Sequence, residues 1–101
     1  MVEVKKKKQG KNITYVLYGE LDMTSIEILE EIIDNDDYTS MKTVYFYLSN
    51  LDFIDSTGIG QLIKYYRKFL EREMDVKIKN DNPEIEEILE LIGVRKVIEG
   101  A

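Results

Sequence analysis

The strongest constraint on the fold is a run of five apolar and aromatic residues, Val44-Tyr45-Phe46-Tyr47-Leu48. A strand with one solvated face alternates apolar and polar residues, and this run shows no such alternation. The pattern is typical of a strand that is covered on both faces, as in the centre of a parallel sheet. We therefore predict a central strand, covered on both faces, at residues 44–48.

Three further segments have the composition of strands. Residues 2–7 and 13–18 are separated by the turn signal Gln9-Gly10-Lys11-Asn12, which predicts that they form a hairpin. Residues 74–78 alternate over a shorter length and predict another strand. The lysine run Lys5–Lys8 is interpreted as a solvated edge of the sheet, because lysine often protects strand edges.

Apolar residues at helical spacing separate these strands. A capping box, Thr24-Ser25-Ile26-Glu27, predicts a first helix in which Thr24 is the cap. This helix should run to about Asn35. Residues 59–70 predict a second amphipathic helix, and residues 83–92 predict a third, which begins with proline at its first position.

The resulting order, β-β-α-β-α-β-α, predicts the α/β class with right-handed crossovers between parallel strands. We expect a four-stranded, mostly parallel sheet with one antiparallel hairpin strand at the N-terminus. Three to four helices are expected, because residues 94–98 predict either one more helical turn or a short strand. A length of 101 residues suits a single domain over residues 1–101.

The absence of histidine and cysteine removes whole classes of chemistry. Without histidine there is no imidazole base and no Ser-His-Asp triad. Without cysteine there is no thiolate nucleophile, disulfide or cysteine-bound metal. Carboxylates, hydroxyls, lysines and the backbone remain for chemistry, and of the two interpretations, enzyme or non-enzymatic protein, we favour a protein that is not an enzyme and needs no cofactor.

Nucleic-acid and membrane partners are not expected either. The formal net charge is −6, whereas binding to a phosphate backbone needs neutralising cations. No apolar run approaches the ~18 residues of a membrane span, and Met1–Lys5 lacks the apolar stretch of a signal peptide, so a cytoplasmic location is expected. Six tyrosines could suggest base stacking, but their spread over strands and a helix indicates core and half-buried packing, with Tyr65 as the exception because it falls at the flank of its helix's buried stripe. They are Tyr15, Tyr18, Tyr45, Tyr47, Tyr65 and Tyr66.

Two polar segments follow strands of the predicted sheet. Gly19-Glu20-Leu21-Asp22 follows the second strand, and Asp55-Ser56-Thr57-Gly58-Ile59-Gly60 follows the third. Ligand sites of open α/β sheets lie beyond the carboxyl ends of the strands. If these two strands are neighbours, Asp22 and Asp55 converge near Ser56. Ser56 also directly precedes a helical pattern, which predicts that it is the N-cap.

Ser56 has a structural and a functional interpretation. As an N-cap, it would only satisfy a backbone N–H group. As a phosphorylation site, it would place a charge of about −1.5 to −2 at a helix N-terminus, which favours anions, beside Asp22 and Asp55, which repel them. A partner protein covering this corner would then be released without refolding.

The neighbouring residues leave further alternatives open. Gly58 and Gly60 each cost roughly 1 kcal/mol in a helix, so either backbone access or close helix–sheet packing must matter at these positions. Asp22 and Asp55 could bind a divalent cation, although acidic residues at strand ends are more often caps and solvated turns. The segment around Ser56 is not a Gly-x-Ser-x-Gly nucleophile elbow, and no nucleotide-binding glycine motif is present.

Gly19-Glu20-Leu21-Asp22, followed at this distance by Asp55-Ser56-Thr57-Gly58-Ile59-Gly60, resembles the anti-sigma factor antagonists among the STAS domains. The resemblance covers nearly the whole chain. It implies that Ser56 accepts a phosphate from a serine kinase that is also the anti-sigma factor. It further implies that the unmodified chain binds this kinase, that the phosphorylated chain releases it, and that a serine phosphatase resets it.

The same resemblance assigns the surroundings of Ser56. It implies that Asp22 lies beside the phosphorylation site and that Gly58 and Gly60 open the following helix around Ile59. Thr57 matches a position that is serine or threonine in the family, and it is a second, less favoured acceptor. Two other functions remain open, a scaffold role for the same fold in a signalling assembly and the binding of a small ligand or nucleotide at the strand ends.

Overall fold

The computed structural model describes residues 1–93, and its strands and helices follow the order that the sequence predicts. The elements are β1 (Glu3–Gln9), β2 (Asn12–Leu21), the short 3-10 helix η1 (Met23–Ser25), α1 (Ile26–Asp34), β3 (Thr43–Ile54), α2 (Ser56–Glu71), β4 (Asp75–Lys79) and α3 (Pro83–Ile92). The segment predicted at residues 94–98 lies outside the described residues.

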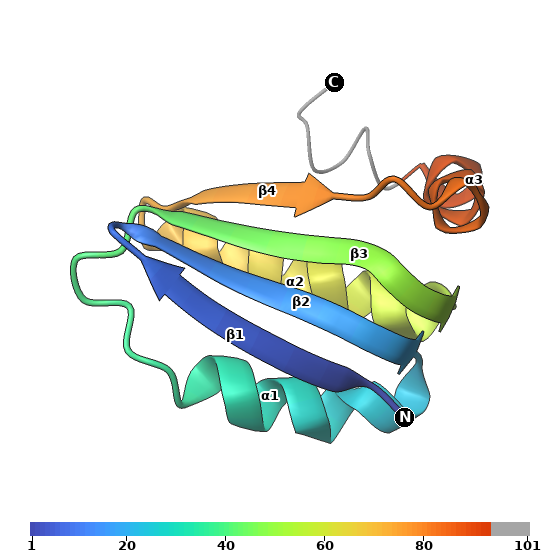
Figure 1. Ribbon diagram of the computed structural model, residues 1–101, viewed down its shortest axis with the longest axis horizontal. Helices are drawn as coiled ribbons and strands as arrows, with labels where there is room; N and C mark the ends of the chain where they lie inside the picture. The colour runs from blue at the N-terminus through green and yellow to red at the C-terminus, as the bar shows by residue number, and fades with distance from the viewer. Residues whose placement is uncertain (94–101) are drawn as a thin grey trace.

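The four strands form one sheet in the order β1-β2-β3-β4 (Figure 1). β1 is antiparallel to β2, whereas β2 pairs with β3, and β3 with β4, in parallel. Gly10 forms the tip of the hairpin with a positive φ of 60°, a conformation that glycine adopts without steric cost. The predicted fold class, a mostly parallel sheet with one antiparallel hairpin strand, is therefore confirmed.

β3 lies in the centre of the sheet as predicted, but only one of its faces is buried. Val44, Phe46 and Leu48 point into the core, while Tyr45 is half-buried and Tyr47 remains 39% exposed. The prediction of a strand covered on both faces was wrong. Tyrosine combines an apolar ring with a polar hydroxyl, so an unbroken aromatic pattern is compatible with a face that contacts water.

α1 and α2 cover the same face of the sheet and lie side by side. Two ion pairs join them, Lys64 to Glu30 at 3.0 Å and Lys68 to Asp34 at 2.8 Å. α2 crosses behind the strands in Figure 1, and its Phe69 packs against Phe46 of β3 with ring centroids 6.4 Å apart. The main core therefore lies between this helical layer and one face of the sheet.

α3 begins and ends as the sequence predicts. The Asn82 side chain accepts a hydrogen bond from the Glu84 N–H, Pro83 occupies the first turn, and Gly93 ends the helix with φ 75°. Such a left-handed glycine is a common helix C-cap. Ile85 and Leu89 are buried, and the helix lies beyond the end of β4 (Figure 1).

A polar network closes the end of the sheet where the parallel strands begin. We name it the Asp36 network; it comprises Lys6, Lys8, Tyr15, Asp36 and Tyr38. The Tyr15 hydroxyl donates to Asp36 at 2.8 Å and lies 2.6 Å from the Tyr38 hydroxyl, while Lys6 and Lys8 pair with Asp36 at 3.0 and 3.3 Å. β1 is an edge strand as predicted, but two of its four lysines bind this nearly buried carboxylate.

Candidate functional site

The two polar segments singled out in the sequence meet at one end of the sheet. β2 and β3 are neighbours, and Leu21 pairs with Ile54 in the last register position of the ladder. The Asp55 N–H donates to the Leu21 carbonyl oxygen at 3.3 Å. Asp22 and Asp55 therefore leave adjacent strands at the same level, as the topology predicted, and Ser56 follows directly. We name Asp22, Asp55, Ser56 and Thr57 the Ser56 corner.

The N-cap of α2 is Asp55. Its backbone is extended, with φ −121° and ψ −175°, and its Oδ1 accepts a hydrogen bond from the Gly58 N–H at 3.0 Å. Ser56 is instead the first residue of the helix, so its predicted role as the N-cap was wrong. The reason is that the carboxylate one residue earlier already makes the capping bond. The side chains of Ser56 and Thr57 are both exposed.

Gly58 and Gly60 have different structural settings. A Cβ atom on Gly58 would lie 2.0 Å from the Leu21 carbonyl oxygen and 2.9 Å from the Leu21 Cγ. Glycine is therefore required there by close contact between α2 and β2. A Cβ atom on Gly60 would meet nothing within 4 Å, and Gly60 is exposed. Ile59, between them, is buried in the core, so it anchors the helix and is not part of the surface around Ser56.

Asp22 caps the short 3-10 helix that leads into α1. Its Oδ1 accepts hydrogen bonds from the Thr24 hydroxyl at 2.6 Å and the Thr24 N–H at 2.9 Å. These two bonds hold the pKa of the Asp22 carboxyl below its usual range, so it carries a negative charge at neutral pH. The predicted capping box was wrong, because Thr24 lies within η1 and donates to Asp22, and Ser25 precedes α1 without a side-chain capping bond.

A buried polar contact that the sequence analysis missed joins α2 to the segment that follows Asp22. The Ser25 hydroxyl donates to the Asp22 carbonyl oxygen at 2.6 Å and lies 3.2 Å from the Gln61 Oε1. The Gln61 amide nitrogen donates to the Ile26 carbonyl oxygen at 2.9 Å. Both side chains are buried. The only sequence signal was one polar residue, Gln61, between Ile59 and Leu62 of the apolar helix pattern.

Exposed apolar side chains also lie close in the sequence to the Ser56 corner. Met23 directly follows Asp22 and is 73% exposed, and Phe53, two residues before Asp55, is 46% exposed. The ladder between β2 and β3 has a register shift between Gly19 and Glu20, and Phe53 pairs with Glu20 there. Large exposed apolar groups are typical of protein contact surfaces when they gather in one place.

The divalent-cation alternative has little support from the geometry. Among residues 1–93, no group of three acidic side chains is arranged to hold a metal ion. Asp22 and Asp55 each accept hydrogen bonds from backbone N–H groups as helix caps.

Within residues 1–93, none of the helices combines the length and apolar character needed to cross a membrane.

Comparison with protein families identifies the domain to which this site belongs. The model of the STAS domain matches residues 3–100, almost the entire chain. The chain belongs to the STAS domain family. An anti-sigma-B factor antagonist of Staphylococcus aureus is 24% identical over 80 residues, which cover 79% of this chain and 74% of that protein.

Solved structures of anti-sigma factor antagonists share the fold. An anti-sigma factor antagonist from Mycobacterium paratuberculosis superimposes with a TM-score of 0.83 at 23% identity, over 96% of this chain and 82% of that chain. The anti-sigma factor antagonist SpoIIAA in its unphosphorylated form gives 0.71 at 22% identity, over 91% and 82%. The phosphorylated form of the Bacillus cell fate determinant SpoIIAA gives 0.65 at 21% identity, over 91% and 85%. At these identities the likeness establishes the fold.

Proposed function

We propose that this STAS domain is an anti-sigma factor antagonist, not an enzyme, and that phosphorylation of Ser56 switches its binding to a serine kinase that is also the anti-sigma factor. The observation that carries the proposal is the position of Ser56. Its side chain is exposed at the first position of α2, one residue after the carboxylate that caps the helix. A kinase can reach such a hydroxyl without unfolding the domain.

The electrostatics of the corner explain why a phosphate would act as a switch. The first N–H groups of a helix have no acceptor within the helix, and together with the macrodipole they favour an anion. Asp22 and Asp55 directly follow the ends of neighbouring strands at the same level, and their negatively charged carboxylates repel an added phosphate. The phosphate is thus compatible with the fold, while a partner that docks on the unmodified corner meets new bulk and negative charge.

The relatives support the same assignment. The S. aureus protein and two of the similar structures are named anti-sigma factor antagonists, and SpoIIAA is known in phosphorylated and unphosphorylated forms. In this chain Asp55-Ser56-Thr57-Gly58 stands at the start of α2, the helix that follows the central strand β3. A serine phosphatase that acts on the phosphorylated chain completes the proposed cycle.

The proposal is tested by recovering the chain with its partner from native cells and mapping phosphate by mass spectrometry. We expect a co-purifying serine kinase and a phosphate on the peptide that contains Ser56. Calorimetry with that kinase should give tight binding for the wild type and for Ser56→Ala. Ser56→Asp should bind about 100-fold more weakly, because it adds a negative charge beside Asp22 and Asp55 and like charges buried at an interface are costly.

Thr57→Ala provides the matched control, because it removes the neighbouring exposed hydroxyl and leaves Ser56 in place. It should retain both phosphorylation and kinase binding. Equal kinase affinity for Ser56→Ala and Ser56→Asp, or a phosphate found only on Thr57, would contradict the proposal.

A further inference from the structure

The face of the sheet opposite α1 and α2 carries a regular pattern of lysine and aromatic side chains. Successive residues of a strand point to opposite faces of the sheet. The residues that alternate with the buried ones along each strand therefore project from this open face. The cross-strand register then builds two rows that each cross all four strands. From β1 to β4, the first row consists of Lys5, Val16, Tyr47 and Lys79, and the second row consists of Lys7, Thr14, Tyr45 and Lys77.

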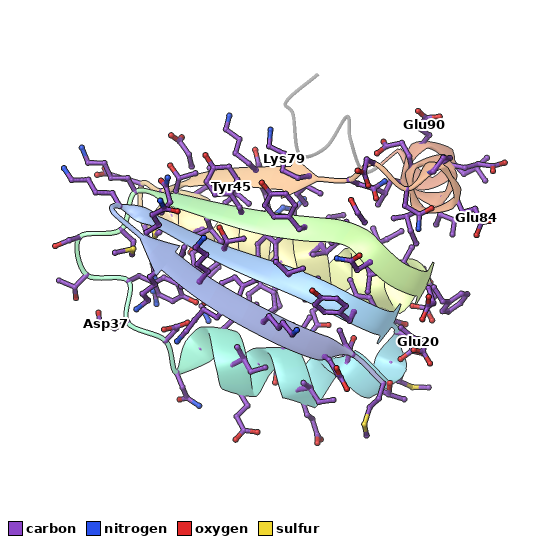
Figure 2. All side chains as sticks on the ribbon, viewed as in Figure 1. Glu20, Asp37, Tyr45, Lys79, Glu84 and Glu90 are labelled. Carbon is purple, nitrogen blue, oxygen red and sulfur yellow. The ribbon has the colours of Figure 1, made fainter. Side chains whose placement is uncertain are left out.

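The aromatic groups form the floor of this face. The rings of Tyr45 and Tyr47 have centroids 6.4 Å apart, and the Lys5 ammonium lies 5.3 Å from the Tyr18 ring. Figure 2 shows Tyr45 over β3 on the side turned to the viewer, with Lys79 on the neighbouring strand. The packing predicted for these tyrosines holds for the buried Tyr15, and Tyr65, which was predicted to be the exception, is buried as well, whereas Tyr47 is 39% exposed.

The lysines form the two sides. Lys5 and Lys7 stand on β1, and Lys77 and Lys79 on β4, so three strand spacings of about 4.8 Å separate the two columns by about 14 Å. All four are exposed. The ion pairs among residues 1–93 use the N-terminus and other lysines, namely Lys6, Lys8, Lys64 and Lys68. The chain therefore has a local cationic face although its net charge is −6.

We propose that this open face binds an amphipathic helix of a partner protein, with an apolar stripe against Val16, Tyr18, Tyr45 and Tyr47 and acidic flanks against the two lysine columns. Parallel strands are normally covered on both faces, and the usual cover is a helix. A helix with its side chains is about 10–12 Å wide, which fits between columns about 14 Å apart. Acidic side chains along both flanks would meet Lys5 and Lys7 on one side and Lys77 and Lys79 on the other.

Other occupants fit the face less well. A nucleic-acid strand running along the columns would meet Glu3 at one end and Asp75 at the other, both exposed beside the lysines. A second copy could offer the acidic α3, whose Leu91 is 80% exposed, but Ile85 and Leu89 of that helix are buried in its own core and cannot supply the apolar stripe. Residues 94–101 contain Arg95, Lys96 and Glu99, so the chain's own last segment lacks acidic flanks.

Titration of the full-length, isotope-labelled chain with a synthetic peptide tests the proposal by NMR. The peptide of about 18 residues has a leucine stripe flanked on both sides by glutamates, and a scrambled peptide of the same composition is the control. We expect saturable shifts of the amides of residues 14–18 and 45–47 with the amphipathic peptide only. The double variant Lys77→Glu/Lys79→Glu should weaken binding about tenfold.

The matched control is Lys11→Glu/Lys42→Glu, which changes the net charge equally at exposed positions outside the two rows and should alter affinity by less than about twofold. Absence of saturable shifts, equal binding of the scrambled peptide, or equal loss in the two double variants would overturn the proposal. So would tighter binding of an oligothymidylate to this face, or self-association in light scattering that Lys77→Glu/Lys79→Glu abolishes. Ser56→Asp should bind the peptide like the wild type, which separates this face from the Ser56 switch.

Discussion

The two ends of the sheet use polar residues in opposite ways. In the Asp36 network, side chains from β1, β2 and the α1–β3 loop bind one another, and the side chain of Asp36 is only 5% exposed. In the Ser56 corner, Asp22 and Asp55 bind backbone groups of their own segments, and Ser56 is left exposed. The first end ties distant parts of the chain together, and the second presents a hydroxyl on a firmly held backbone. The Asp36 network and the proposed modification site thus lie at opposite ends of the sheet.

Gly58→Ala should have the largest effect on stability, although the buried Gly58 directly follows the exposed Ser56 and Thr57. Its Cβ would overlap the Leu21 carbonyl oxygen, a backbone atom that cannot move aside, so we expect a loss of about 3 kcal/mol or more in the free energy of unfolding. Gly60→Ala, in open space two residues later, should raise it by about 0.5–1 kcal/mol through helix propensity. Urea unfolding measures the free energy of unfolding of both variants. Similar changes in the two variants would contradict the close contact between α2 and β2 at Gly58.

Tyr15→Phe should lower the free energy of unfolding by about 2 kcal/mol. The change removes the hydroxyl that donates to Asp36 and contacts Tyr38, and it leaves a buried carboxylate without one of its donors. Tyr45→Phe removes a hydroxyl from the open face of the sheet and should change stability by less than about 0.5 kcal/mol. Thermal and urea unfolding of the two variants would contradict the anchoring role of the network if the losses were equal.

Asp36→Asn should cost about 1–2 kcal/mol at neutral pH and change the pH dependence of stability. Burial raises the pKa of Asp36, but the hydrogen bonds from Tyr15, Lys6 and Lys8 outweigh it, so the folded-state pKa is below its usual range. The contribution of this carboxylate is therefore present above the unfolded-state pKa, near 4, and is lost as pH falls through the folded-state value. Urea unfolding across the acidic range should show a steeper loss in the wild type than in Asp36→Asn.

The same network should weaken at high pH. Burial is the largest cause that raises the pKa of Tyr38, to about 12, and the negative charge of Asp36 adds to it, while the hydrogen bond with Tyr15 acts in the opposite direction. A raised pKa contributes stability below the unfolded-state value near 10, which is lost as pH rises through about 12. The free energy of unfolding of Tyr38→Phe, measured with urea between about pH 10 and 12, should depend less on pH than that of the wild type. The same loss of stability at high pH in both proteins would contradict the role of the Tyr38 hydroxyl.

Asp55→Ala and Ser56→Ala should give the smallest effects and separate the two roles within the corner. Asp55 makes the capping bond to Gly58, so its removal should cost about 1 kcal/mol in unfolding free energy. Ser56→Ala should cost less than about 0.5 kcal/mol, because its exposed side chain does not cap the helix. The reverse order in urea unfolding would restore Ser56 as the structural cap.

The sequence alone determined the order of the elements, the hairpin and the parallel pairing, and it predicted that Asp22 and Asp55 meet on the condition, met in the structure, that β2 and β3 are neighbours. These features follow from local periodicity, turn residues and the handedness of crossovers, all of which act over short stretches of chain. The edge position of β1 was also available from its lysines. The start of α2 was predicted within one residue, but the capping residue was not, because Asp55 and Ser56 are both good caps.

Only the tertiary structure decided which face of β3 is covered, because the Tyr45 and Tyr47 pattern fits either a buried or a wetted surface. It also decided that Gly58 is sterically required while Gly60 is not, since that difference depends on the distance of each Cα from β2. Lys6 and Lys8 pair with Asp36 across about 30 positions of the chain, and no local pattern signals such a contact. Burial, close contact and long-range pairing are properties of how elements pack, and a one-dimensional pattern constrains them only weakly.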